Sequence, residues 1–459
     1  MMLIFMIPVV GLAVDSGVLY LVRARLSMAC DAAALSTARN LNIGLTLSDQ
    51  MANAQARGLA FFSANFPTGT LGTTNIVPTL NIVQSGTSTI LVTASAAGSA
   101  PLYFMRFFGS STNIAGASGQ ASRRDVNLML VLDKSGSMSG TPCSDMIAAA
   151  STFVNLFVNG RDHLGLVTFS SGAVLDYPPS VNFKSGNVLT NAISAVTCGG
   201  WTNTAYAYEK AYAQLVSINQ PLALNLIVFF TDGNPTAFTA IFPIKTQTDT
   251  RYGYSGGSCG YTSTCSIAKS TCTDDNGKTY GQSGWGTFQP KLATVVYGGY
   301  DAPFNPDANN SYFSSGFSGC TLLSQDFGQR RDFAYMPSTS SNGNSIYGYK
   351  PVTTFSSGAY SGYPRNDDAD SVENIGYNLA VNAAATARNN STLNVVTYTI
   401  GLGSNGGVDG DFLLRMSNDL ASPTFDNTKS AGLYVFAPNS TDLNQAFARV
   451  ASAVLRLSQ

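Results

Sequence analysis

The feature that most constrains the fold is a buried strand that ends in a cluster of hydroxyl and carboxylate side chains. Residues 127–132 form a nearly continuous apolar run, and Asp133, Ser135 and Ser137 follow it directly. Such a run is typical of a strand that is covered on both faces. A second apolar run, residues 224–231, is also followed by a carboxylate, that of Asp232. Open α/β sheets bind ligands at the carboxyl ends of their strands, so we expect these polar side chains to meet at one edge.

Strand and helix patterns alternate through the rest of this part of the chain. Apolar residues recur at helical or strand spacing in segments 146–158, 164–169, 173–177 and 205–216, and again in 370–388, 393–400, 411–420, 433–436 and 442–457. This alternation implies right-handed βαβ crossovers and a doubly wound sheet. We therefore expect residues 124–236 and 370–459 to form one α/β domain.

A third loop, residues 199–204, precedes an expected helix and supplies a threonine. In chain order, Asp-x-Ser-x-Ser at 133–137, this threonine and Thr-Asp-Gly at 231–233 resemble the metal-ion-dependent adhesion site of von Willebrand factor A (VWA) domains. The resemblance implies a Rossmann-like VWA sheet. It also implies a metal ion whose inner ligands are Asp133, Ser135, Ser137 and Thr202, with Asp232 bound directly or through water. Thr204 lies on the same loop and competes with Thr202.

This donor set suits a hard divalent cation. Mg²⁺ takes about six oxygen ligands in nearly octahedral geometry. Hydroxyls supply neutral oxygens, so two carboxylates leave the ion electron-poor, and it should bind an anionic oxygen from outside, such as a partner's carboxylate. We expect Mg²⁺, with Mn²⁺ or Ca²⁺ as alternatives. Each fragment alone could be an ordinary turn, but the three in order favour a metal site.

The amino-terminal segment is predicted to be a membrane anchor over residues 1–22. Residues 1–14 are apolar or small, and 22 residues, Asp15 among them, precede Arg23. That length is enough to reach across a bilayer if the carboxylate lies towards the interface. The alternatives are a cleaved signal peptide and a buried helix of a soluble protein.

Residues 11–20 and the alanine-rich residues 23–35 are similar to the amino-terminal signature of TadE/TadG-like Flp pilus-assembly proteins. The strand-like pattern at 90–96 and the segment that follows it resemble the small β-rich part of these proteins. The resemblance implies a helix plus a small β region over residues 23–123. It also implies an anchor in the cytoplasmic membrane, with the bulk of the chain in the periplasm or outside the cell.

Residues 237–369 interrupt the α/β pattern and differ from it in composition. They are rich in Gly, Ser, Tyr, Asn and Thr and contain few aliphatic runs. The segment begins shortly after Asp232, so it must emerge on the face that would carry the metal. We expect a specificity-determining cap beside the ion. The alternative is a disordered surface excursion.

Seven cysteines in an exported chain suggest disulfides and one odd thiol. Cys143 lies six residues after Ser137 and Cys198 lies four before Thr202, so a bridge between them would clamp two metal-binding loops. The alternative for this pair is two small buried residues. Cys30 is the leftover thiol. The insertion holds four more cysteines, for which three pairings are open: Cys259, Cys265, Cys272 and Cys320.

Composition and motifs argue against nucleic-acid binding and against catalysis. The net charge is −1, so no basic field favours nucleic acid. The single histidine gives no support for a Ser–His–Asp hydrolase, and the Gly-x-Ser-x-Gly match at 253–257 has no flanking strand and helix. We expect a non-enzymatic adhesion or assembly factor of a Tad-like pilus whose partners are pilus-assembly or envelope proteins. The alternatives are a surface sensor or scaffold unrelated to pili and a structural protein with a dead metal site.

Overall fold

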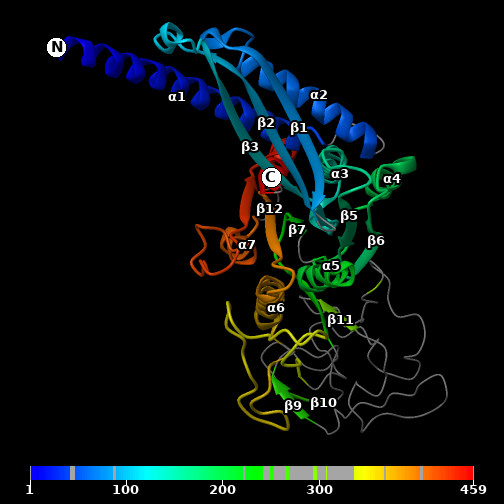
Figure 1. Ribbon diagram of the computed structural model, residues 1–459. Coiled ribbons are helices and arrows are strands. Elements are labelled where there is room, and N and C mark those ends of the chain that lie inside the picture. Colours follow the sequence, from blue (N-terminus) through cyan, green and yellow to red (C-terminus); the bar gives the residue numbers. More distant parts are fainter. Residues whose placement is uncertain are drawn as a thin grey trace.

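The computed structural model contains an amino-terminal α+β unit that leads directly into an α/β domain (Figure 1). It describes residues 2–41, 47–85, 89–220, 223–240, 249–252, 264–267, 293–296, 307, 335–365, 368–403 and 407–457.

The amino-terminal unit packs two helices on a three-stranded antiparallel sheet of order β1-β2-β3. The helices are α1 (Met2–Arg39) and α2 (Leu47–Asn65), and the strands are β1 (Thr74–Ser85), β2 (Thr89–Pro101) and β3 (Thr112–Arg124). Small residues allow the layers to approach closely. A Cβ at Gly119 on β3 would lie 2.6 Å from the backbone nitrogen of Asp31 on α1. The alanine-rich part of α1 thus packs against the sheet. The small α+β region that the sequence predicts is present.

Helix α1 is continuous through both the apolar segment and the alanine-rich segment. Its amino-terminal end projects away from the rest of the molecule (Figure 1). Within the described part of the chain, no helix has a stretch of sufficient length and hydrophobicity to cross a bilayer. The membrane anchor over residues 1–22 therefore stays a prediction.

The α/β domain is built on a six-stranded sheet of order β13-β12-β7-β4-β5-β6, parallel except for the edge strand β6, which runs antiparallel to β5. The strands are β4 (Val126–Asp133), β5 (His163–Phe169), β6 (Ala173–Ser180), β7 (Leu224–Thr231), β12 (Val396–Leu402) and β13 (Leu433–Ala437). Strand β12 pairs with β7, which pairs with β4. The segments on the two sides of the insertion therefore share one sheet, as the sequence predicts.

Helices cover both faces of this sheet, so the domain is doubly wound. One core contains side chains of α5 (Thr204–Ile218), α6 (Ala369–Asn389) and α7 (Gly410–Ser417). The other contains side chains of α3 (Thr141–Val154), α4 (Val188–Ser194) and α8 (Leu443–Leu457). Strand β4 serves both cores because alternate residues point to opposite faces: Met129 enters the first core and Leu130 the second. This explains why β4 reads as a continuous apolar run.

Buried ion pairs join the amino-terminal unit to the α/β domain at the junction of β3 and β4. Arg123, which is 3% exposed, lies 3.4 Å from the carboxylate of Asp162, and Arg161 pairs with Asp125. Asp162 also accepts a hydrogen bond of 3.1 Å from the backbone N–H of Val126. Breaking such a buried pair leaves an uncompensated charge, so these contacts hold the unit in place on the domain.

Two described parts of the insertion, residues 237–240 and 335–365, lie against the α/β domain. Strand β8 (Ala237–Ala240) pairs with β11 (Ala293–Val296), and β9 (Asp249–Tyr252) pairs with β10 (Thr264–Ile267). Residues 335–365 are held to α5 by Glu209, which is 4% exposed. Its carboxylate accepts hydrogen bonds of 2.6–2.7 Å from Ser340, Asn342 and Asn344. This segment is therefore a docked element. The pairing of Cys259, Cys265, Cys272 and Cys320 lies outside the described residues.

Candidate metal centre

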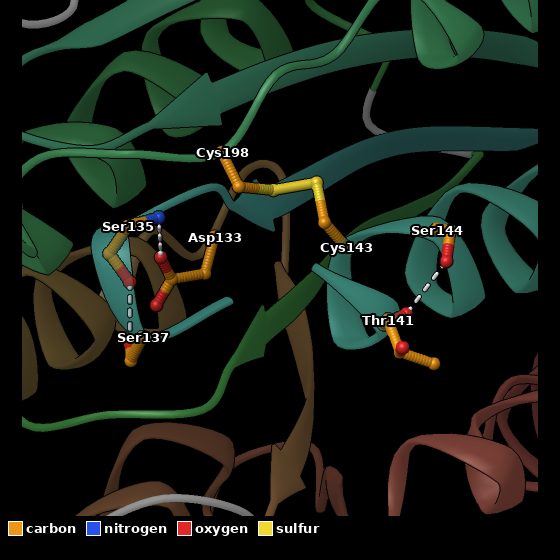
Figure 2. The surroundings of a disulfide bond; sticks show 7 residues. All are labelled: Asp133, Ser135, Ser137, Thr141, Cys143, Ser144 and Cys198. Carbon is orange, nitrogen blue, oxygen red and sulfur yellow. Dashed lines mark hydrogen bonds between the residues drawn. A yellow bond between two sulfur atoms is a disulfide. The ribbon is translucent and has the colours of Figure 1, made fainter. Parts of the chain in front are cut away.

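Three of the predicted ligands lie together where β4 ends. Asp133 is the last residue of β4, and the short helix η3 (Gly136–Met138) follows it. The backbone N–H of Ser135 donates to Asp133 Oδ1 at 2.7 Å, and the hydroxyls of Ser135 and Ser137 lie 3.0 Å apart. Figure 2 shows this turn, with both serine side chains beside the carboxylate. The Asp-x-Ser-x-Ser spacing thus places three oxygen-bearing side chains on one side of one turn.

Strand β7 brings the second carboxylate to the same place. Because β7 pairs with β4 in parallel, the residues after both strands emerge at one edge of the sheet. The hydroxyl of Ser137 donates to Asp232 Oδ1 at 2.7 Å, across 95 positions of sequence. Asp133 is completely buried, and Asp232 is 2% exposed. Two buried carboxylates that are far apart in the sequence therefore converge on one cluster of hydroxyls.

Thr231 contacts the candidate centre, although the sequence does not single it out as a ligand. Its hydroxyl donates to Asp133 Oδ2 at 2.5 Å, so it orients the carboxylate from the neighbouring strand. Its only sequence signal is its position directly before Asp232 in the Thr-Asp-Gly motif. The contact depends on the lateral pairing of β4 and β7, which the motif alone does not reveal.

The loop that carries Thr202 is joined to this turn through its backbone. Gly199 donates to the carbonyl of Lys134 at 2.7 Å, and Gly136 donates to the carbonyl of Gly200 at 2.8 Å. The two glycines lie so close that a Cβ at Gly136 would be 3.2 Å from the oxygen of Gly200, which itself has φ of +99°. The positive φ favours glycine at position 200 and the close approach favours it at position 136, and the contact holds the threonine loop against the Asp133 turn.

The two candidate threonines differ in their surroundings. Thr202 is 5% exposed, and its backbone is fixed by Thr236, whose hydroxyl accepts from the Thr202 N–H at 2.8 Å. Thr204 begins α5 and is completely buried, and its hydroxyl makes no hydrogen bond within the described part of the protein. The capping side chain of α5 is that of Asn203, which accepts from the N–H of Tyr206. Both threonines remain candidates for the ligand.

The electrostatics of the two carboxylates favour a bound cation. Burial raises the pKa of Asp133 to about 7, and the negative charge of Asp232 adds to the effect, whereas hydrogen bonds from Thr231 and Ser135 oppose it. Burial also raises the pKa of Asp232. Among the described residues, the buried Oδ2 of Asp232 has no hydrogen-bond partner. A divalent ion would relieve this unfavourable burial, so the residues present fit such an ion.

The donor set is dominated by hydroxyls. In the described portion of the chain, no group of three or more His, Cys, Asp or Glu side chains is placed to hold a metal. An ion at this edge would therefore depend on Ser135, Ser137 and a threonine for its remaining oxygen ligands. Such a site carries little negative charge of its own, so it suits Mg²⁺ and an additional anionic ligand.

A disulfide joins the two loops that flank the centre. Cys143, in the first turn of α3, is bonded to Cys198, directly before the glycines of the threonine loop. Their Cα atoms are 6.2 Å apart. Figure 2 shows the bond beside the turn of Asp133, Ser135 and Ser137. The bridge that the sequence raised as a hypothesis is thus present, and Cys30 is a buried free thiol.

Stabilisation by Mg²⁺ is expected to be larger near pH 8 than near pH 5. The raised pKa of Asp133 means that the folded, metal-free protein holds a proton that the unfolded chain has lost. The contribution of Asp133 to the free energy of unfolding of the metal-free protein therefore falls as the pH rises from about 4 to about 7, by up to roughly 4 kcal/mol. A Mg²⁺ ion at this site would compete with this proton, so its binding should be strongest above the folded pKa. Melting curves with and without Mg²⁺ at both pH values measure the effect, and equal shifts at both would contradict it.

Comparisons with known proteins confirm both family resemblances. Residues 128–234 match the family model of the von Willebrand factor type A domain. Residues 1–40 match that of the putative Flp pilus-assembly TadE/G-like family. A search of curated proteins found no match.

Several solved structures are similar at low identity. One is the vWF domain of the type V pili tip protein Mfa5 from Porphyromonas gingivalis, with 14% identity over 74% of this chain and 98% of that chain, and a TM-score of 0.39. Another is the pilus adhesin SpaC from Lactobacillus rhamnosus GG, with 12% identity over 83% of this chain and 34% of that chain, and a TM-score of 0.36. A third is the PilB minor pilin from Streptococcus sanguinis, with 15% identity over 84% of this chain and 79% of that chain, and a TM-score of 0.33.

Proposed function

We propose that this chain, which joins a TadE/G-like amino-terminal segment to a VWA domain, is an envelope-exposed adhesion or assembly factor of an Flp-type pilus. It binds the carboxylate of a partner protein through Mg²⁺ held at the carboxyl edge of the sheet. The observation that carries this proposal is the convergence of two buried carboxylates, Asp133 and Asp232, on a cluster of hydroxyls. Burying these two carboxylates costs free energy without a cation, and with a cation they can hold it in place.

Each residue of the centre has a distinct part in this mechanism. Asp133 and Asp232 supply the charge that retains the ion, while Ser135, Ser137 and Thr202 or Thr204 supply neutral oxygens. When bound, the ion supplies a positive centre for an incoming carboxylate. Thr231 fixes the orientation of Asp133, and the Cys143–Cys198 bond keeps the serine turn and the threonine loop together. The protein thereby holds its ligands in place before the partner arrives, which lowers the entropic cost of binding.

The insertion would select the partner, because it begins beside the threonine loop. Its first strand, β8, begins at Ala237, which packs against Trp201 beside Thr202. The backbone N–H groups of Thr236 and Ala237 both donate to the carbonyl of Thr202, at 3.0 and 3.1 Å. A partner that reaches the metal centre therefore approaches the start of the insertion as well. This supports the role of residues 237–369 as a cap that sets specificity.

The amino-terminal segment would attach the protein to the cytoplasmic membrane, with the α/β domain in the periplasm or outside the cell. The match of residues 1–40 to the TadE/G-like family and the projection of the amino-terminal end of α1 from the rest of the molecule support this arrangement. The second function, a surface sensor or scaffold that uses the same site, differs from the first only in its partner and in having no role in pili.

Cells that carry Asp133→Ala test the proposal. We expect loss of attachment together with loss or reduction of surface pili, since the partner's carboxylate would have no cation to bind. Asp370→Ala, the same substitution at an exposed residue in the first turn of α6, is the matched control and should behave as wild type. Normal attachment and normal pili in the Asp133 variant would overturn the proposal. Lost attachment with unchanged pili would exclude a role of the centre in pilus assembly and leave an adhesion role, on the pilus or on a surface scaffold.

A further inference from the structure

The loop after β2 exposes a concentration of aromatic side chains. It contains the short helix η2 (Met105–Phe108), and the exposed fractions are 52% for Tyr103, 36% for Phe104, 82% for Phe107 and 71% for Phe108. Single exposed apolar residues are common on proteins, but four aromatic residues within six positions form a patch. Such a patch marks a surface that is covered in the working protein.

This loop is fastened to α1 by Asp15. The carboxylate is 1% exposed and accepts hydrogen bonds from three successive backbone N–H groups: those of Tyr103 at 2.7 Å, Phe104 at 3.1 and 3.2 Å, and Met105 at 2.8 Å. The ring of Phe104 also packs on the helix, because a Cβ at Gly11 would lie 2.7 Å from it. Asp15 is therefore a latch that sets the position of the aromatic loop along the helix.

The surroundings of the latch are apolar, with one positive charge. Asp15 is the only charged residue among positions 1–22, and its carboxylate is fully engaged by the loop. Arg106 is the only charged residue among positions 99–111, and it is exposed. On the helix beside the loop, exposed apolar side chains continue the surface: Val9, Val10, Leu12 and Val14. Exposed aromatic rings, aliphatic side chains and an arginine are the combination that binds at a lipid interface.

We propose that residues 103–108 dock into the interface of an anionic lipid bilayer beside α1. Phe107 and Phe108 enter the boundary between headgroups and acyl chains, and Arg106 pairs with anionic headgroups. Asp15 is a positioning residue: its charge is satisfied by the loop's backbone, and it holds the loop at the level of the apolar part of α1. The inference rests on the membrane attachment in the proposed function and adds a second lipid contact, which would fix how the sheet is oriented at the membrane.

Tryptophan quenching in the full-length protein tests this contact. Phe107→Trp, reconstituted in vesicles of phosphatidylcholine and phosphatidylglycerol, adds a fluorophore to the two native tryptophans. Vesicles with brominated acyl chains should reduce the added emission by about twofold or more relative to unbrominated vesicles, since bromine quenches only rings at acyl depth. Phe436→Trp, at a 51% exposed phenylalanine of β13, is the matched control and should show no added quenching.

Asp15→Ala and Arg106→Gln separate the parts of the proposal. Asp15→Ala in the Phe107→Trp background should reduce the quenching while the protein still sediments with vesicles. Arg106→Gln should reduce it in anionic vesicles and leave it unchanged in phosphatidylcholine alone. Two results would show that the loop inference is wrong while the membrane anchor stands. In the first, the protein sediments with vesicles but the tryptophan at position 107 is not quenched. In the second, the emission of that tryptophan is already blue-shifted without lipid, by contact with another protein surface. If the protein does not sediment at all, both the loop inference and the anchor are wrong.

Discussion

Replacing Asp133 by alanine is expected to abolish Mg²⁺ binding while the protein stays folded. Asp133 supplies one of the two carboxylates of the centre, and it fixes the serine turn through the N–H of Ser135. Changes in residues that only support a metal ligand already cost roughly 10–100-fold in affinity. Loss of the carboxylate itself should exceed that range. Calorimetric titration of Mg²⁺ into the metal-free, full-length protein measures the effect directly.

The fold is expected to survive because an ionised Asp133 is not a net stabiliser of the metal-free protein. Burial raises the pKa of this carboxyl to about 7, so at neutral pH its charge opposes folding. The substitution removes the carboxylate that accepts hydrogen bonds from Thr231 and Ser135. Leaving these donors without a partner should lower the free energy of unfolding by about 1–3 kcal/mol. Thr231→Val is the graded control: it keeps both carboxylates and should weaken Mg²⁺ binding only partly. Wild-type affinity in Asp133→Ala, or an unfolded variant by circular dichroism, would contradict this account.

The second large effect is expected from removal of the disulfide. The Cys143–Cys198 bond closes a loop with a sequence separation of 55, for which chain entropy predicts about 4 kcal/mol of stabilisation. The Cys143→Ser, Cys198→Ser double variant should therefore melt roughly 10 °C lower than the oxidised wild type. It should also bind Mg²⁺ more weakly, because the serine turn and the threonine loop would be held only by backbone hydrogen bonds.

Thermal unfolding and metal titration of this double variant check both effects. Cys30→Ala is the control for the loss of a buried thiol, because Cys30 takes no part in a disulfide. A melting temperature within about 2 °C of wild type would show that the bridge contributes little to stability. Mass spectrometry of the non-reduced protein should find Cys143 and Cys198 in one cross-linked peptide.

Much of the sheet could be predicted because its buried strands have unambiguous patterns. The runs that became β4 and β7 are almost entirely apolar, since both faces of these strands are covered. Strand β12, predicted at 393–400 and observed at Val396–Leu402, joins the same sheet across an insertion of more than a hundred residues. Its assignment succeeded because a buried parallel strand needs a neighbour on each side: β13 supplies one, and the other had to come from before the insertion.

The amino-terminal unit was predicted only in outline, for identifiable reasons. Strand β1 contains Pro78, which argues against a central strand, but β1 is an edge strand and tolerates proline. Helix α2 contains Gly58, which lowers helix propensity. The packing explains it: a Cβ there would lie 1.9 Å from the hydroxyl of Thr37 on α1. Both residues are unfavourable locally: Pro78 is tolerated because β1 is an edge strand, and Gly58 is favoured by its close contact with α1, which a local pattern does not reveal.

The candidate site, like the fold, could be predicted only in part from the sequence. The spacing of Asp133, Ser135 and Ser137 indicates a shared turn, because all three follow one strand. Two hydrogen bonds depend on which strands are neighbours in the sheet. One joins Ser137 to Asp232, and the other joins Thr231 to Asp133. The sequence could place these residues at the ends of strands, but only the strand order brings them into contact. The choice between Thr202 and Thr204 depends on the same lateral geometry.

The most direct test of the central claim is anomalous diffraction from crystals of the full-length protein soaked in Mn²⁺. The account predicts a strong anomalous peak among Asp133, Ser135, Ser137 and Asp232, with ligand oxygens at about 2.1 Å and a threonine oxygen completing the protein ligands. The same crystals of Asp133→Ala should lack that peak. A wild-type crystal with no peak at this edge of the sheet, or with its peak at another cluster, would contradict a metal-dependent adhesion site in this protein.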